Sequence, residues 1–130
     1  MPNEAEVYFG LFGEFDPDQV SLGVAPTRTR KKGVPGPKHS SWEYSTGKVR
    51  GEVVDVYEMA SGLVRALEPH TGKIVEAKRA LGLEAVLEVV LTFSLDEQAS
   101  TPAVGFESHV ISFLDSVGAS IDVDTYRGER

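Results

Sequence analysis

The sequence predicts an α+β fold, in which one mostly antiparallel or mixed sheet of about four or five strands carries helices on one face. Two observations support this prediction. Several short segments alternate between apolar and other side chains, and between them lie segments in which apolar side chains recur every three or four residues. The length of 130 residues and the hydrophobic fraction of 41% fit a single globular domain, residues 1–130.

The first half of the chain combines strands with a short helix and a loop rich in glycine and proline. Ala5, Val7, Phe9 and Leu11 recur with a period of two, which is typical of a strand with one buried face. Asp16-Pro17-Asp18-Gln19 has the composition of a helix start, so we expect a short helix over 17–22. The remaining elements expected in this half are an extended segment over 24–31, a loop over 33–37 and a strand over 42–46.

The second half has more regular periodicity. Apolar residues spaced by three and four predict a long helix over 52–67, with Val53, Val56, Tyr57, Ala60, Leu63, Val64 and Leu67 on its buried face. Residues 84–95 are apolar in both alternating rows, so we expect this strand in the centre of the sheet. The other elements expected here are a helix over 71–81 ending at Gly82, a helix over 107–117 ending at Gly118, and a strand over 119–126.

These periodicities also predict which side chains form the core. They are the members of the apolar rows on the expected strands and helices: Phe9, Leu63, Leu67, Leu87, Val89, Leu91, Phe113, Leu114 and Val123. No apolar stretch approaches the roughly 20 residues that a membrane-spanning helix needs, and the acidic N-terminal residues differ from a signal peptide. Together with the absence of cysteine, this favours a cytoplasmic protein.

Charge is distributed unevenly along the chain. The net charge is -7, yet residues 28–50 carry seven of the thirteen basic side chains and only one acid, Glu43. The loop over 27–39 is therefore a candidate docking surface for an acidic protein surface or a small anion. The candidate binding residues are Arg28, Arg30, Lys31, Lys32, Trp42 and Tyr44.

Each of these candidates has a functional and a structural interpretation. Arg28 and Arg30 fall on one side of an extended segment, where two guanidinium groups can bind a carboxylate or phosphate together. Trp42 and Tyr44 share one side of the next strand and could add a stacking surface. Alternatively, the cations pair with acids of the same chain and Trp42 belongs to the core. Nucleic acid is the least favoured partner, because the protein is acidic outside this window.

The sequence gives little indication of catalysis. The three histidines, His39, His70 and His109, lie in separate segments, and no nucleophile, phosphate-binding or metal motif is present. The acids that gather near Asp16 are explained by helix capping, and Asp122 and Asp124 by the solubility of an exposed strand face. We therefore expect no catalytic residue, no metal and no cofactor.

Four segments give the chain a resemblance to the bacterial domain-of-unknown-function family numbered 4279. They are residues 9–18, residues 22–33 with Gly23-Val24-Ala25-Pro26-Thr27 leading to Lys32-Gly33, residues 41–44 with Trp42-Glu43, and the closing Ile121-Asp122-Val123-Asp124-Thr125-Tyr126. The resemblance covers nearly the whole chain and implies no activity. Domains of this size are sometimes encoded beside bacterial toxins, which suggests a non-enzymatic binding domain, including an immunity-type protein. The alternative is a small-anion-binding domain or enzyme with a pocket that uses Arg28 and Arg30.

Overall fold

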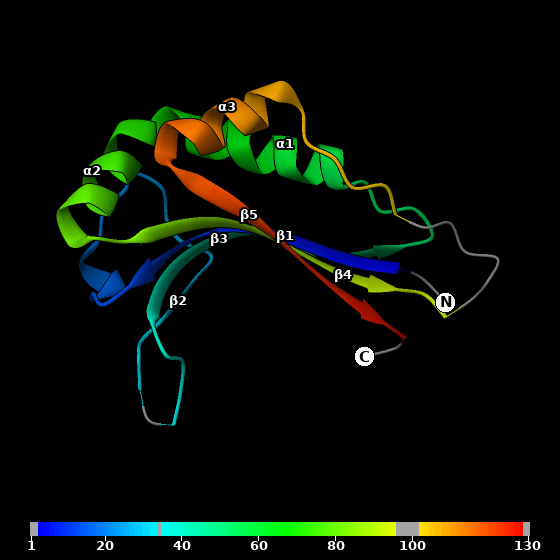
Figure 1. Cartoon of the computed structure of the whole chain (residues 1–130), viewed down its shortest axis with the longest axis horizontal. Coiled ribbons are helices and arrows are strands. Elements are labelled where there is room, and N and C mark those ends of the chain that lie inside the picture. The colour runs from blue at the N-terminus through cyan, green and yellow to red at the C-terminus, as the bar shows by residue number, and fades with distance from the viewer. Residues whose placement is uncertain (1–2, 34, 96–101, 129–130) are drawn as a thin grey trace.

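The computed structural model describes residues 3–33, 35–95 and 102–128, and within them it contains one five-stranded mixed sheet (Figure 1). All neighbouring strands are antiparallel except the last pair, β4 and β5, which is parallel. In spatial order the strands are β2 (Arg28–Arg30), β3 (Ser40–Gly51), β1 (Asn3–Gly13), β4 (Glu84–Phe93) and β5 (Ala119–Arg127). The predicted α+β fold is confirmed.

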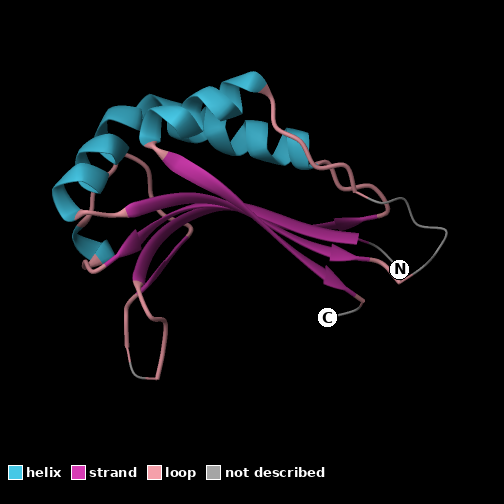
Figure 2. Cartoon of the chain, in the orientation of Figure 1, coloured by secondary structure: helices cyan, strands magenta, loops and turns pink. Residues whose placement is uncertain are grey.

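Three α-helices lie on one face of this sheet (Figures 1 and 2). They are α1 (Val56–Leu67), α2 (Thr71–Leu81) and α3 (Ser108–Val117). The 3-10 turn η2 (Glu68–His70) connects α1 to α2. The predicted ends of the last two helices are confirmed, because Gly82 and Gly118 cap them with φ angles of 65° and 64°. This left-handed conformation is accessible to glycine without strain.

Two predicted helices are shorter in the structure. The first long helix begins at Val56 rather than near residue 52, because Asp55 is extended and its side chain accepts a hydrogen bond from the Glu58 backbone N–H at 3.2 Å. Val53 is therefore outside the helix and 78% exposed. The helix expected over 17–22 is the single 3-10 turn η1 (Pro17–Gln19), since Val20 is already extended.

The hydrophobic core lies between the sheet and the helices. Eight of the nine predicted core residues are buried there, and Phe9 and Phe113 contact edge to face with ring centroids 5.7 Å apart. Val123 was predicted to be buried but is 42% exposed. It points to the helix side next to Val89, yet the described helices do not cover this outermost strand. Tyr57, also expected on the buried helix face, is 43% exposed.

The middle strand of the sheet is β1, not β4. β1 pairs with β3 on one side and with β4 on the other, while β4 lies between β1 and β5. The apolar second row of β4 is explained by this interior position, because Val86 and Val90 on that row are half-buried without a helix above them. Among the described residues, no helix is both long and apolar enough to cross a lipid bilayer.

Candidate functional site

The sheet face opposite the helices, which we call the open face, is covered by none of the described helices (Figure 2). Strand register decides which side chains it presents. Arg28 pairs with Glu43, Glu43 with Gly10, and Gly10 with Val86, so these four side-chain positions share the open face. The face therefore runs from the basic strand β2 at one edge to the acidic strand β5 at the other.

Trp42 and Tyr44 point to the other side of the sheet. Trp42 is fully buried, and Tyr44 packs against the same core. They do share one side of β3, as predicted, but it is the side opposite to the guanidinium groups of Arg28 and Arg30, because β2 pairs with β3 in the register Thr29 opposite Trp42. The predicted aromatic surface next to the two arginines is therefore wrong.

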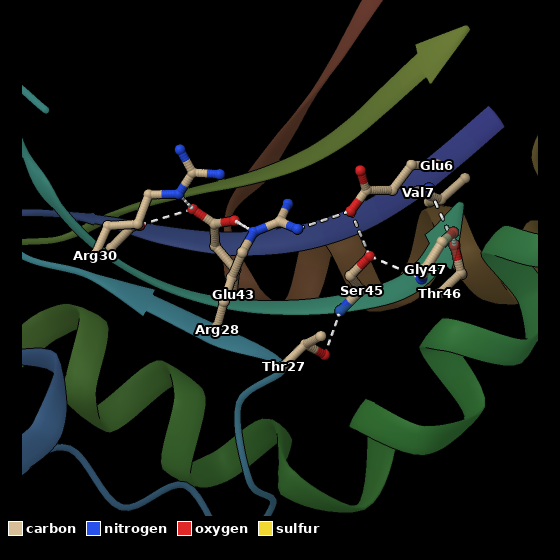
Figure 3. A network of polar contacts seen from close by, with 10 residues as sticks. Glu6, Val7, Thr27, Arg28, Arg30, Glu43, Ser45, Thr46 and Gly47 are labelled. Atoms are coloured by element: carbon tan, nitrogen blue, oxygen red, sulfur yellow. Dashed lines mark hydrogen bonds and ion pairs between the residues drawn. The ribbon is translucent and has the colours of Figure 1, made fainter. Parts of the chain in front are cut away.

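The buried carboxylate of Glu43 holds both arginines (Figure 3). The Arg28 Nε group donates to Glu43 Oε1, while Arg30 Nε lies 3.5 Å from Oε2. The Ser41 hydroxyl donates to the same Oε2 at 2.7 Å. Since only 2% of the Glu43 side chain is exposed, its charge requires these partners to offset the loss of hydration.

Arg28 also bridges to β1. Its Nη1 atom lies 3.0 Å from Glu6 Oε2, and Glu6 accepts a hydrogen bond from the Ser45 hydroxyl at 2.6 Å. The guanidinium carbon lies 4.7 Å from the centre of the Tyr8 ring, which is a cation–π contact. Burial, with the nearby charges of Glu88 and Glu43, raises the pKa of Tyr8 to about 12. The Tyr8 phenol therefore stays protonated even at the alkaline pH where an ordinary tyrosine ionises.

Lys31 and Lys32 pair with acids of the turn that follows β1. Lys31 Nζ lies 2.9 Å from Asp18 Oδ2, and Lys32 Nζ lies 2.7 Å from Glu14 Oε1. The hydrogen bonds from these ammonium groups hold the pKa of Asp18 and of Glu14 below their usual values. Four of the predicted binding residues, Arg28, Arg30, Lys31 and Lys32, thus form ion pairs with acids of the same chain, as the structural interpretation expects.

The opposite edge of the open face gathers three acids. Glu88 on β4 pairs in register with Asp122 on β5, and one carboxylate oxygen from each of Glu88, Asp122 and Asp124 lies within 4.8 Å of the other two. Burial and the charges of the two aspartates raise the pKa of Glu88 to about 7. No described residue hydrogen-bonds to Glu88 Oε2. We call these three residues the acidic cluster.

The acidic cluster is the feature that sequence reasoning missed. Alternation placed Asp122 and Asp124 on one strand face, but nothing local to residue 88 indicated that Glu88 would join them. The parallel pairing of β4 with β5 brings it there, across a connection that includes α3. Such carboxylates are also oxygen ligands of the kind that hold divalent cations, and exposed acids often gather without one.

The middle of the open face is partly apolar. The Phe12 ring lies over Gly10, so closely that a methyl group at Gly10 would meet ring carbons at 2.5 and 2.6 Å. Val86 pairs with Gly10 from the neighbouring strand and is half-buried. The open face therefore has an aromatic and aliphatic centre between a basic edge and an acidic edge, a distribution suited to contact with another protein.

Described residues form three surface hollows. One, of about 380 Å³, lies between η1 and α2, next to Lys73 and Ala77. Two others, of about 290 Å³ each, lie beside Tyr57 and beside His39, and the one beside His39 reaches Phe12 on the open face. Arg28 and Arg30 line none of these three hollows.

Comparison with known proteins gives a family and no activity. Neither the search of curated proteins nor the search of solved structures returned a match. The family model described as "Domain of unknown function (DUF4279)" matches residues 3–128, which is nearly the whole chain. The resemblance read from the sequence motifs is thereby confirmed, and the chain belongs to the DUF4279 family.

Proposed function

We propose that this chain is a non-enzymatic protein-binding domain and that the open face of its sheet is the binding surface. The observation that carries the proposal is the pair of charged edges on a sheet face that the described helices leave uncovered. An antiparallel or mixed sheet can leave one face in contact with solvent, and such a face does not require charges in fixed positions. On the open face, by contrast, basic side chains gather at one edge and acidic side chains at the other.

The basic edge is held in one orientation. Because Glu43 fixes the side chains of Arg28 and Arg30, a partner that binds there loses little side-chain entropy in those two residues. Arg30 remains 53% exposed and has donors left for an acidic group of the partner. The predicted acidic partner is therefore retained for this edge, with Arg30 rather than the lysines as its main contact.

The acidic edge has the opposite character. The charges of Asp122 and Asp124 disfavour the ionised form of Glu88, so a cationic group of a partner would relieve an unfavourable interaction in the unbound protein. A protein with both basic and acidic side chains fits both edges, whereas a nucleic acid would meet repulsion from the acidic cluster. An immunity-type protein that covers a toxin surface is one form that this function can take.

The alternative function, a small-anion site or an enzyme pocket built on Arg28 and Arg30, has less support. An anion would have to compete with Glu43 and Glu6, which already contact Arg28. The three hollows described above also lie away from both arginines. Protein partners bind to broad surfaces, whereas small ligands bind in pockets, so the open face fits a protein partner better.

A comparative capture experiment tests this function. The wild-type protein, the open-face variant Asp122→Asn/Asp124→Asn with Arg30→Gln, and a control variant are immobilised, and proteins retained from a native extract are quantified. The control, Glu58→Gln/Asp115→Asn, removes two exposed acids from α1 and α3 on the opposite side. We expect proteins that the wild type and the control retain and the open-face variant loses. Identical retention by all three folded proteins would contradict the proposal.

A further inference from the structure

β5 is a long strand at one edge of the sheet that the described residues form. It has nine residues, while β2 at the other edge has three. Within the described residues, β5 has a neighbouring strand on one side only. Short edge strands, bulges, covering loops and charged side chains are the usual means by which proteins prevent pairing with other chains. β5 is long and regular along its pairing with β4, and it carries the charged side chains of Asp122 and Asp124, so a further strand along residues 121–124 has to complement these two acids.

The two faces of this edge differ chemically. Ile121 and Val123 point to the helix side and are 41% and 42% exposed. Asp122 and Asp124 point to the open face, where Glu88 joins them. An added strand would therefore meet aliphatic side chains on one face and carboxylates on the other. Side chains directly opposite each other in neighbouring strands interact, with like charges destabilising and opposite charges stabilising the pair.

A second copy of this chain does not fit this edge. In a two-fold antiparallel pairing of β5 centred on Val123, positions of the same face meet, so Asp122 of each copy would lie beside Asp124 of the other. That arrangement adds negative charge to a cluster that already contains three carboxylates, and the net charge of -7 on each copy opposes it further. Complementarity requires a cationic strand.

We propose that β5 binds an extended segment of another protein as a sixth strand, in which lysine or arginine side chains facing the acidic cluster alternate with aliphatic side chains facing Ile121 and Val123. This inference rests on the proposed binding function and specifies the partner segment. Main-chain hydrogen bonds along β5 would supply affinity, and the two alternating rows would supply specificity.

The acidic cluster gives the binding a pH dependence. The charged and titratable groups that act on Glu88 are Asp122 and Asp124 from β5, Tyr8 from β1 and Glu43 from β3. A bound cation favours the ionised form of Glu88, which is partly protonated in the unbound protein near neutral pH. Binding is therefore expected to be tighter at about pH 8 than at about pH 5.5, with release of a proton from Glu88 near neutrality.

The test uses two synthetic peptides of the same length as β5, one alternating lysine with valine and its twin alternating glutamate with valine. Dissociation constants are measured by titration calorimetry at low micromolar protein concentration, and amide hydrogen exchange locates the bound peptide. We expect the lysine peptide to bind about ten-fold or more tightly than the glutamate peptide. Its binding should slow exchange in residues 119–127, which form β5.

The variant Asp122→Asn/Asp124→Asn should weaken the lysine peptide about five-fold or more, whereas Glu58→Gln/Asp115→Asn, with the same change in net charge, should not. Equal affinity for both peptides, absence of binding, or protection outside β5 overturns the strand-addition proposal. A β5-paired dimer of the unbound protein in light scattering also overturns it. The broader function fails separately, when the capture experiment shows no loss by the open-face variant.

Discussion

The two edges of the sheet carry opposite charge and differ in whether neighbouring side chains offset that charge. On the basic edge, Arg28 and Arg30 are both paired with the buried Glu43, so part of their positive charge is offset within the chain while Arg30 stays 53% exposed. On the acidic edge, Asp122 and Asp124 face a third carboxylate, Glu88. A run of like charges in a sequence therefore does not reveal an exposed potential, because cross-strand neighbours decide whether it is neutralised.

The largest expected effect separates the interior of the sheet from the acidic edge. Leu91→Ala should lower the free energy of unfolding by about 2 to 5 kcal/mol, since Leu91 is 1% exposed and its removal leaves a cavity. Val123→Ala on β5 should cost less than about 1 kcal/mol, because that side chain is 42% exposed. Urea denaturation of both variants measures the difference. Equal losses would mean that β5 is packed as tightly as β4.

A substitution of Glu43 tests the ion pairs of the basic edge. Glu43→Gln keeps the shape of the side chain but removes the charge that pairs with Arg28 and Arg30, and we expect a loss of about 3 kcal/mol in the free energy of unfolding. This is the lower end for a buried pair, because both arginines are partly exposed. Asp122→Asn on the acidic edge should leave stability unchanged or increase it. A Glu43→Gln protein as stable as wild type would show that the ion pairs contribute nothing.

The acidic edge should make stability depend on pH. An unfolded glutamate ionises near pH 4.5, whereas Glu88 in the folded protein has a pKa of about 7, so between these values the folded state retains a proton that the unfolded state has lost. The contribution is fully present below about pH 4.5 and is lost as the pH rises through 7. Allowing for solvent screening, we expect about 1 to 2 kcal/mol.

The variant Glu88→Gln isolates this contribution, because glutamine cannot ionise. Urea denaturation at a series of pH values should give a profile for the variant that falls less steeply between pH 4.5 and 7 than that of the wild type. Parallel profiles for the two proteins would place the pKa of Glu88 near its ordinary value and remove the contrast between the two edges.

The smallest effect concerns the lysines beside the basic edge. Lys32→Ala should not change the urea midpoint measurably, since Lys32 and Glu14 are both exposed and such pairs contribute little. It should still raise the pKa of Glu14 toward its usual value, because the hydrogen bond and charge of Lys32 hold it down. Nuclear magnetic resonance titration of the Glu14 side chain measures this, and Lys31→Ala serves as the control that acts on Asp18 instead.

Local periodicity predicted the elements well and their surroundings less well. The alternation of residues 84–95 and 119–126 correctly placed Leu87, Val89 and Val123 on the helix side of the sheet. It could not indicate that the helices would leave β5 uncovered, because alternation determines the direction of a side chain and not what packs above it. For the same reason Val123 was assigned to the core although Val89 beside it is the buried residue.

The candidate site shows the same limit. That Arg28 and Arg30 share one side of a strand follows from a period of two, and the register confirms it. The periodicity does not show that Glu43 lies between the two arginines or that Trp42 points away from them. Both follow from the register in which β2 pairs with β3 across the intervening loop. Glu88 was missed because its partners come from a strand that follows later in the chain.

The central position of β1 has a consequence for synthesis on the ribosome. β1 is made before the other strands, yet one of its two neighbours, β4, ends only at Phe93. Until then the apolar row of β1 can be covered only by β3 and the early helices, and one backbone edge of β1 stays unsatisfied. Such contacts between distant parts of a chain slow folding. While the second half is translated, the unpaired edge of β1 should therefore have to be kept from pairing with other nascent chains.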